Sequence, residues 1–347
     1  MAVGGSMSLT KRLPLRHFLS TLDYTRVEVE RLLERAADFK RAPIQPRLVD
    51  KTMALVFFNP SLRTRASFDI GMRQLGGSAV VLEPGKGSWP IEFEDGVVMD
   101  GEAEEHVHEV ARVLSRYTDL IGVRAFPKFK RWEEDRQDRV IQSFARYAEV
   151  PVINMETITH PCQELALALT MKERLGSLAG KKLVLTWTYH PKPLNTAVAN
   201  SALIIAAKLG MDVTLLCPNE DYLLDPRYMD AARESAMASG ASVTVTHDID
   251  AAYEGADMVY AKSWGAIPYF GRWDDEKPIR DANKHFIVDE AKMAKTRTGL
   301  FSHCLPVRRN VKVTDGVVDS PGSMVIDEAE NRLHVQKAVM DMLIHGL

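Results

Sequence analysis

The chain has 347 residues, of which 46% are hydrophobic and 26% charged, a composition typical of a globular protein with room for two domains of ordinary size. Its 44 lysines and arginines against 47 aspartates and glutamates leave a net charge of -3, which excludes a global positive field for nucleic-acid binding. No apolar run is long enough to cross a bilayer, so we expect no membrane span.

The chain has three cysteines, Cys162, Cys217 and Cys304. They are too few and too scattered for a disulfide framework, and no CxxC pair suggests structural zinc, so we expect a reducing, cytoplasmic setting. Residues 1–7 lack the basic and apolar regions of a signal peptide and are interpreted as a flexible leader.

The first half of the chain alternates between helix and strand patterns. Helical spacing of apolar residues predicts a helix over 27–39, and the nearly continuous apolar run 51–58 predicts a buried parallel strand. The helical period over 64–75 ends at Gly76 and Gly77. The further elements expected here are strands 79–82, 120–124 and 152–154 and helices 104–117 and 140–147.

A second series of the same kind follows a helix that begins near His160. We expect strands 182–188, 212–217, 242–246, 258–261 and 299–302 and helices 194–209, 228–239 and 333–344. The sequence therefore predicts an α/β fold of two doubly wound parallel-sheet domains with the active site in the cleft between them. We place the first domain at 1–158, with a C-terminal helix at 325–347 packing back on it, and the second at 159–324.

The strongest local signal is the turn Asn59-Pro60-Ser61-Leu62-Arg63-Thr64-Arg65, between a buried strand and a helix start. The free N–H groups and dipole of a helix N-terminus favour a phosphate, hydroxyls donate to it, and guanidinium groups clamp it. The alternative is a serine N-cap followed by surface arginines. Polar residues at other predicted strand ends favour the ligand-binding interpretation, because open α/β sheets bind their ligands there.

Those other strand ends carry Arg124, the run Glu156 to Gln163, and His303-Cys304-Leu305-Pro306. Each has a simpler interpretation: Arg124 as a surface ion pair, His160 as a helix cap, Cys304 as a small buried hydrophobe. A zinc site from the histidines and cysteines of these runs is disfavoured, because their spacing matches no common zinc pattern.

Two cofactor classes lack their motifs. No phosphate-binding loop of the G-x-x-x-x-G-K-[ST] kind exists, and no G-x-G-x-x-G follows a strand. The strand predicted over 182–188 runs instead into His190-Pro191-Lys192-Pro193, whose prolines offer no amide donors for a pyrophosphate. A nicotinamide-dependent dehydrogenase is therefore disfavoured.

Ser-Leu-Arg-Thr-Arg, His-Pro-Cys-Gln and His-Cys-Leu-Pro, in this order, resemble the aspartate and ornithine transcarbamylase superfamily over nearly the whole chain. The usual motifs read S-T-R-T-R, H-P-T-Q and H-C-L-P, so Leu62 and Cys162 are departures. The resemblance implies a carbamoyltransferase that uses carbamoyl phosphate and needs no cofactor and no metal. It implies catalytic roles for Thr64, Arg124, His160 and Cys304. The implied donor-site residues are Ser61, Leu62, Arg63, Thr64, Trp89, Arg124, His160, Pro161, Cys162, Gln163, Cys304, Leu305 and Arg332.

The segment that indicates the acceptor is Tyr260-Ala261-Lys262-Ser263-Trp264-Gly265. Ornithine transcarbamylases have an aspartate where this chain has Lys262. A lysine would repel the α-ammonium of ornithine and attract a carboxylate. The acceptor should therefore be an N-acylated ornithine, whose α-nitrogen is a neutral amide and whose δ-amine is the nucleophile. The alternatives are ornithine, N-succinylornithine or another amine as acceptor, and, in a different class, a non-catalytic regulatory or binding protein of the same fold.

The departure at Lys262, with the runs 87–92 and 190–195, resembles the N-acetylornithine-specific branch of the family, which acts in arginine biosynthesis. The resemblance implies a homotrimer in which Trp89 reaches a neighbouring subunit. It also implies acceptor contacts from Glu156, Lys262, Pro90, Glu92 and Asn195, with Pro90 interpreted as the acetyl-specific form where succinyl-specific relatives carry a glutamate. Lys312 matches a lysine that is carboxylated in this branch, against the simpler interpretation of an unmodified surface lysine. Trp89 and Pro90 could equally be ordinary loop residues.

Overall fold

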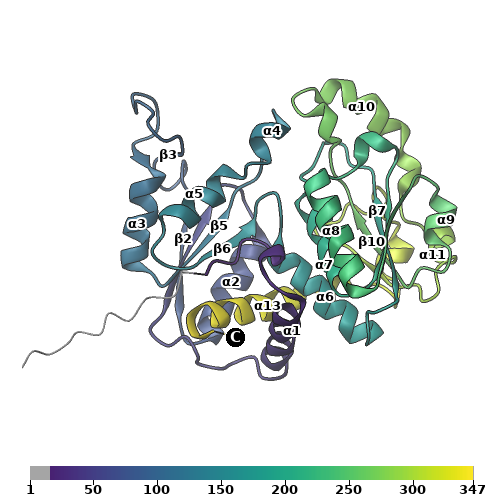
Figure 1. Ribbon diagram of the computed structural model, residues 1–347, viewed down its shortest axis with the longest axis horizontal. Helices are drawn as coiled ribbons and strands as arrows, with labels where there is room; N and C mark the ends of the chain where they lie inside the picture. Colours follow the sequence, from purple (N-terminus) through teal and green to yellow (C-terminus); the bar gives the residue numbers. More distant parts are fainter. Residues whose placement is uncertain (1–15, 347) are drawn as a thin grey trace, which may run out of the picture.

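The computed structural model describes residues 16–346, so the leader interpreted at 1–7 lies outside the described residues. Two parallel sheets, each flanked by helices, form two lobes side by side (Figure 1), which confirms the expected fold class. None of the helices within 16–346 is long and apolar enough to cross a membrane.

The first sheet has four parallel strands, buried where they meet the flanking helices. In spatial order they are β2 (Ser78–Leu82), β1 (Thr52–Phe57), β5 (Leu120–Arg124) and β6 (Val152–Glu156). The helices of this part are α1 (Arg26–Arg41), α2 (Leu62–Gln74), α3 (Val107–Tyr117), α4 (Trp132–Asp135) and α5 (Arg139–Tyr147), and a short pair of strands, β3 (Ile91–Glu92) and β4 (Glu105–His106), lies beside them. Central strands β1 and β5 consist of apolar residues almost throughout because both of their faces are covered.

The second sheet has five parallel strands. In spatial order they are β11 (Phe301–Ser302), β10 (Met258–Lys262), β7 (Lys182–Trp187), β8 (Asp212–Leu216) and β9 (Val243–Thr246). The helices are α6 (Pro161–Leu175), α7 (Ala197–Lys208), α8 (Pro226–Ser239), α9 (Ile249–Tyr253), α10 (Trp273–Ala282), α11 (Glu290–Met293) and α12 (Asp315–Val318). Single 3₁₀ turns cover Thr21–Asp23, Glu220–Tyr222, Ile267–Tyr269 and Lys284–Phe286.

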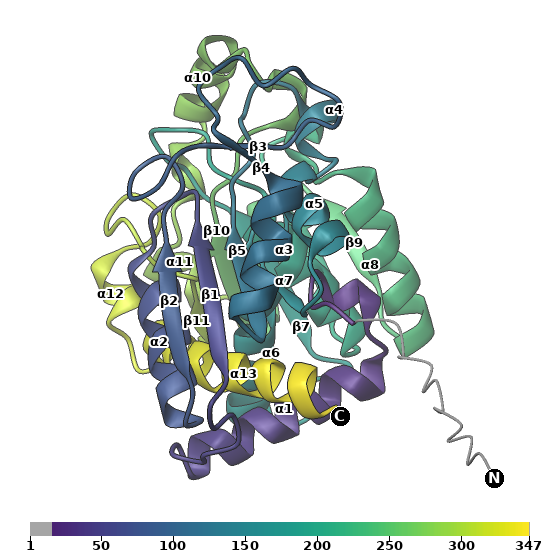
Figure 2. The ribbon, with the colours of Figure 1, turned by 90° about the vertical axis from the view of Figure 1, so that its left-hand side faces the viewer.

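The last helix, α13 (Val325–His345), packs against α1, α2 and α6. In Figure 2 it runs beside α1, below the strands of the first sheet. Its first residue is that of the C-terminal helix expected at 325–347, whereas the apolar pattern by itself predicts only 333–344. The pattern is interrupted because the first two turns are polar on several faces and yet buried, with Glu328, Asn331 and Arg332 all inside the protein. The domain boundary expected between residues 158 and 159 stays a prediction.

Local chemistry explains where several site-bearing elements begin. Ser61 caps α2, its Oγ accepting the N–H of Thr64 at 3.2 Å, and Pro161 occupies the first turn of α6, where its missing N–H costs nothing. Helix α7 begins at Ala197 rather than at 194, because the Asn195 side chain accepts the Ala197 N–H at 3.2 Å. These local contacts set the N-termini of three helices near the strand ends described next.

Candidate active site

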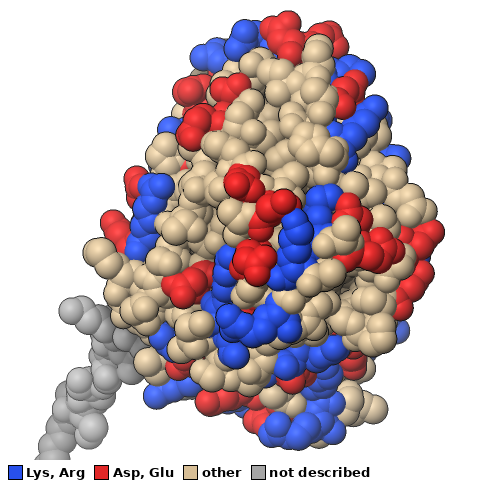
Figure 3. Space-filling view, turned by 90° about the vertical axis from the view of Figure 1, so that its right-hand side faces the viewer, with Lys and Arg blue, Asp and Glu red and all other residues tan. Residues whose placement is uncertain are grey.

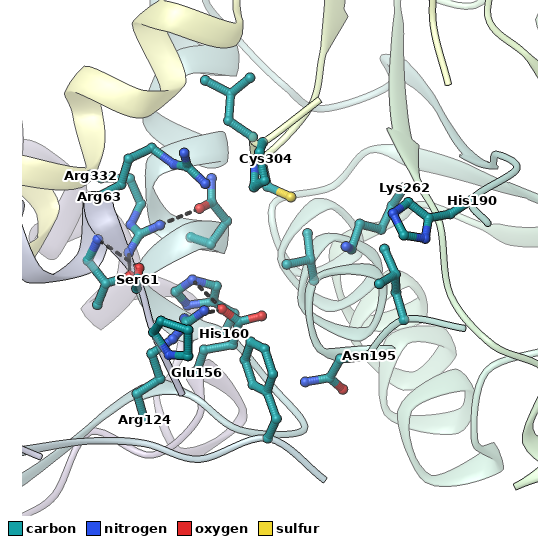
Figure 4. Close-up of a pocket in the computed structure, with 18 of the residues that line it drawn as sticks. Ser61, Arg63, Arg124, Glu156, His160, His190, Asn195, Lys262, Cys304 and Arg332 are labelled. Carbon is teal, nitrogen blue, oxygen red and sulfur yellow. Dashed lines mark hydrogen bonds and ion pairs between the residues drawn. The ribbon is translucent and has the colours of Figure 1, made fainter. Parts of the chain in front are cut away.

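A cavity of about 600 Å³ is lined by residues from both sheets and from the N-terminal turns of α2 and α6. The lining residues are Pro60, Ser61, Arg63, Thr64, Arg124, Phe126, Glu156, His160, Gln163, His190, Leu194, Asn195, Val198, Lys262, Cys304, Leu305, Pro306, Arg308, Lys312 and Arg332. Figure 4 shows two groups that face each other, with Ser61, Arg63, Arg124, Glu156, His160 and Arg332 on one side and His190, Lys262 and Asn195 on the other. The four strand ends expected to converge therefore meet in one cavity.

The arginine-bearing turn opens α2 toward the cavity. Arg63 lines the cavity and burial lowers the pKa of its guanidinium, whereas Arg65 is exposed and lies 3.6 Å from Glu83 outside it. Thr64 is buried, and its Oγ1 accepts a hydrogen bond from Arg332 Nη2 at 3.0 Å. The hydroxyl hydrogen of Thr64 is thus left to donate to a ligand.

Arg124 and Glu156, at the ends of neighbouring strands β5 and β6, form a buried ion pair. His160 lies beside them, its Nε2 3.5 Å from Glu156. Burial first, and then the nearby cations Arg332 and Arg124, hold the pKa of His160 well below its usual value. The imidazole is therefore neutral near pH 7 and carries one N–H.

Several buried donors around this part of the cavity have no hydrogen-bond partner within residues 16–346. They are Nε of Arg63, Arg124 and Arg332, and Nδ1 of His160 lies unpartnered among them. Burying an unpaired charged donor is costly, so these groups are arranged for an anionic or carbonyl ligand. Glu156 is the one carboxylate in the lining, against the cations Arg63, Arg124, Lys262, Arg308 and Arg332.

The opposite side of the cavity is built on the second sheet. Lys262 ends β10 and is buried, and the His190 imidazole, whose pKa burial lowers to about 4, is held by the backbone of Lys192. Lys312 Nζ lies 3.3 Å from His303 Nε2, and burial together with the charge of Lys262 lowers the pKa of Lys312 to about 7. Lys312 is therefore a buried amine and not the surface lysine of the simpler interpretation.

Six residues that the sequence placed in the site do not line the cavity of this chain: Leu62, Trp89, Pro90, Glu92, Pro161 and Cys162. Leu62 is 82% exposed at the start of α2, whereas Pro161 and Cys162 are buried in the first turn of α6. Trp89 is 54% exposed and donates to Glu105 at 3.0 Å, beside a smaller cavity. Glu92 accepts hydrogen bonds from two backbone N–H groups of its own loop.

The structure also brings in seven residues that sequence reasoning did not assign to the site: Pro60, Phe126, His190, Leu194, Val198, Pro306 and Arg308. Phe126 follows Arg124 by two positions and stacks on it, with the guanidinium carbon 4.5 Å from the ring centroid. Arg308 belongs to the same strand-end segment as Cys304, which was the available signal for it. Val198 carries no such signal, because an apolar residue in a helix is normally a core residue.

Metal ligation has no support in the part of the chain that the structure describes. No three His, Cys, Asp or Glu side chains within 16–346 are grouped so that they could hold a metal ion. On the face shown in Figure 3, Lys and Arg lie among Asp and Glu.

Comparison with known proteins gives matches over both halves. The aspartate/ornithine carbamoyltransferase carbamoyl-P binding domain matches residues 16–173, and the Asp/Orn binding domain of the same family matches residues 182–343. The chain is 67% identical over 332 residues to the N-acetylornithine carbamoyltransferase of Xanthomonas campestris pv. campestris, covering 95% of this chain and 98% of that protein.

The chain is also similar to a relative with a different named acceptor and to a solved structure. The N-succinylornithine carbamoyltransferase of Bacteroides thetaiotaomicron is 40% identical over 299 residues, covering 86% of this chain and 89% of that one. The crystal structure of acetylornithine transcarbamylase complexed with acetylcitrulline superposes with a TM-score of 0.94 at 67% identity, covering 95% of this chain and 99% of that one.

Proposed function

The chain belongs to the aspartate/ornithine carbamoyltransferase family, and we propose that it transfers the carbamoyl group of carbamoyl phosphate to the δ-amine of N-acetyl-L-ornithine. The products are N-acetyl-L-citrulline and phosphate. The observation that carries the proposal is that an arginine-bearing helix N-terminus and a buried lysine face each other across one cavity. The relatives named for N-acetylornithine at 67% identity, against 40% for the one named for N-succinylornithine, support the choice of acceptor.

The phosphate of the donor binds at the first turn of α2. Ser61, Arg63 and the N-terminal amides of the helix supply hydrogen bonds and positive charge, and the helix dipole adds to them. Arg332, whose Nε has no partner among the described residues, adds a second guanidinium on the α13 side. Leu62 takes part through its backbone, since its side chain points to solvent.

Arg124, His160 and Thr64 act on the carbamoyl oxygen. As the amine attacks the carbonyl carbon, negative charge develops on that oxygen, and preorganised donors that are stronger toward the developing charge lower the barrier. Arg124 keeps free donors because only Nη1 is used by Glu156, and Thr64 keeps its hydroxyl hydrogen because Arg332 donates to its oxygen. Cys304 and Leu305 contact the same end of the donor from the β11 side.

The acceptor binds on the Lys262 side with its α-carboxylate against the ammonium. An acetylated α-nitrogen carries no charge, so it avoids the repulsion that the α-ammonium of free ornithine would meet from Lys262 and Arg308. Glu156 and Asn195 border the path of the acceptor side chain, although the Asn195 amide is already used, donating to the Thr157 carbonyl and accepting the Ala197 N–H.

The reaction joins the δ-nitrogen to the carbamoyl carbon and breaks the bond from that carbon to the phosphate oxygen. The nucleophile must be the neutral amine, and the mainly cationic lining disfavours its ammonium form. The departing phosphate, already held by Arg63 and its neighbours, accepts the proton that the amine loses. The chain's own contribution is thus positioning of the two reactants and stabilisation of charge.

Lys312 is proposed to carry a carbamate formed on its side-chain nitrogen. A pKa lowered to about 7 leaves much of the amine neutral and able to react with carbon dioxide at neutral pH. The carbamate would be a buried anion, and Lys262 and Arg308 are the cations placed to compensate it.

We also infer a homotrimeric, cytoplasmic enzyme of arginine biosynthesis, in which Trp89, Pro90 and Glu92 serve the site of a neighbouring subunit. Support comes from four large apolar side chains that are exposed in the segment 89–99, namely Trp89, Val97, Val98 and Met99, and from the absence of Trp89, Pro90 and Glu92 from the lining of the chain's own cavity.

The experiment that tests the function is product identification. Purified enzyme is incubated with carbamoyl phosphate and N-acetylornithine, and the organic product and phosphate are quantified together. Equimolar N-acetylcitrulline and phosphate support the proposal, whereas phosphate release without a carbamoylated amine would refute it.

A further inference from the structure

A chain of buried hydrogen bonds connects the donor end of the cavity to the second sheet. Arg332 Nη2 donates to Thr64 Oγ1 at 3.0 Å, and Arg332 Nη1 donates to Gln163 Oε1 at 2.6 Å. On its other side, Gln163 Nε2 donates to the carboxylate of Glu328. Thr64, Gln163 and Arg332 line the cavity, but Glu328 does not.

Glu328, in the first turn of α13, is 0% exposed. Besides Gln163 it accepts hydrogen bonds from Tyr260 Oη, at 2.9 Å, and from Ser302 Oγ. Burial raises the pKa of Glu328, and the hydrogen bonds from Ser302, Gln163 and Tyr260 oppose that rise. Because three donors point at its two oxygens, the Glu328 carboxylate acts only as a hydrogen-bond acceptor.

These partners fix the orientation of the Gln163 amide. A guanidinium only donates and a carboxylate only accepts, so the amide nitrogen must face Glu328 and the amide oxygen must face Arg332. The reversed amide would oppose two donors at Arg332 and two acceptors at Glu328. Oε1 uses one lone pair on Arg332, so its second lone pair is open to a donor in the cavity.

We propose that Glu328 is a positioning residue that fixes the Gln163 carbonyl toward the donor and thereby selects a carbamoyl group over an acyl group of the same shape. The inference rests on the proposed function, because it takes the –NH₂ of carbamoyl phosphate as the partner of Gln163 Oε1. Acetyl phosphate has a methyl group in that place, which cannot donate a hydrogen bond and leaves the carbonyl unsatisfied.

The same residue links the donor site to the acceptor side. Tyr260 lies two positions before Lys262 on β10, and Ser302 lies two positions before Cys304 at β11. Through its two hydroxyl partners, Glu328 therefore ties the strand ends that carry Lys262 and Cys304 to the amide that contacts the donor.

The test compares the dissociation constant of carbamoyl phosphate with that of acetyl phosphate. Glu328→Met removes every acceptor oxygen at similar volume, and Glu328→Asp withdraws the carboxylate by one methylene; in both, the preference for carbamoyl phosphate should fall about tenfold. Glu328→Gln keeps an oxygen for Gln163 and Tyr260 and should restore the preference to within about twofold of wild type. Glu330→Met, on the same helix but exposed, is the matched control and should change nothing.

A folded Glu328→Met or Glu328→Asp enzyme that keeps the wild-type preference would overturn the inference. Should Glu328→Met fail to fold because it buries three unpaired donors, Glu328→Asp alone decides. A wild-type enzyme that does not bind carbamoyl phosphate would refute the proposed function itself, which separates that failure from a failure of this inference.

Discussion

Arg63, in the first turn of α2, and Lys262, the last residue of β10, line opposite sides of one cavity although α2 flanks the first sheet and β10 belongs to the second. This arrangement gives the cavity two separate cationic ends, one at a helix N-terminus and one at a strand end. Two anionic reactants can be bound there at once with their reacting groups between the cations, and catalysis by positioning requires that arrangement.

Arg63→Ala should weaken binding of carbamoyl phosphate and of inorganic phosphate together, by about 10- to 100-fold, because a charged donor to the phosphate is removed. Isothermal titration with each ligand measures the effect. Arg65→Ala is the matched control, since Arg65 lies two positions away, is exposed and does not line the cavity. Equal losses in both variants would place the anion elsewhere.

The segment that follows β5 contacts the segment that follows β10 at Gly271. Gly271 has φ +81°, and a Cβ there would lie 2.4 Å from the Lys130 carbonyl oxygen, while Trp273 Nε1 donates to the Phe129 carbonyl at 2.9 Å. Gly271→Ala should therefore push the two lobes apart at this contact. We expect a loss of about 3 kcal/mol in the free energy of unfolding and about tenfold in kcat/KM.

Gly240→Ala is the matched control for this substitution. Gly240 has φ +75° and nothing within 4 Å of an added Cβ, so it carries the backbone penalty alone, about 1 kcal/mol. Denaturant unfolding and steady-state kinetics on both variants separate the two effects. If Gly271→Ala behaves like Gly240→Ala in both measurements, the close approach to Lys130 affects neither the stability nor the activity of the enzyme.

The carbamate on Lys312 predicts a pH dependence of defined sign. The amine is neutral above its pKa of about 7 and protonated below it, so the carbamate should be present at high pH and lost as the pH falls through that value. Carbon-13 NMR in labelled bicarbonate should show a carbamate signal at about pH 8 that disappears by about pH 6. Lys312→Arg should lack the signal at both, and an identical spectrum from that variant would contradict the assignment.

The neighbouring-subunit role of Trp89 is tested by mixing two variants that should each bind carbamoyl phosphate weakly, at a donor concentration where each variant alone is nearly inactive. Trp89→Ala and Arg63→Ala subunits, dissociated and reassembled together, should regain about a quarter of wild-type activity, because one site in each mixed trimer combines an intact Arg63 with an intact partner Trp89. Each variant reassembled alone is the control. No recovery, with mixed trimers demonstrated by mass spectrometry, would mean that Trp89 serves its own chain.

The sequence was most informative where chemistry and spacing coincide. The α2 turn, Arg124, the His160 to Gln163 run and Cys304 were predicted because polar residues follow strands in the order of family motifs, and the structure brings these segments to one cavity. Phe126 and Val198 escaped prediction because apolar residues near a site look like core residues. Leu62 and Cys162 illustrate a further limit, since a sequence motif does not say which of its side chains faces the ligand and which faces solvent or the core.

Some helices and strands could be predicted from the sequence and others could not. Strands β1 and β5 were predicted from continuous apolar runs, because burial on both faces leaves that pattern. Short helices such as α4 (Trp132–Asp135) and α11 (Glu290–Met293) were not predicted, because one turn is too short to show a helical period. The apolar pattern alone predicts only the 333–344 part of α13, because buried polar residues, which hydrogen bonds satisfy, interrupt that pattern nearer the start of the helix.

Recognition of the acceptor by Lys262 is tested by the kcat/KM values for N-acetylornithine, N-succinylornithine and ornithine, measured on wild type and on Lys262→Asp. Wild type should prefer N-acetylornithine, and the substitution should lower its kcat/KM about 100-fold or more, because the acceptor carboxylate loses its partner and meets a like charge. The affinity for carbamoyl phosphate should stay within about twofold in the variant, since the donor binds on the other side of the cavity. If the wild type prefers free ornithine, or if Lys262→Asp uses N-acetylornithine as well as the wild type does, Lys262 does not select an N-acylated acceptor.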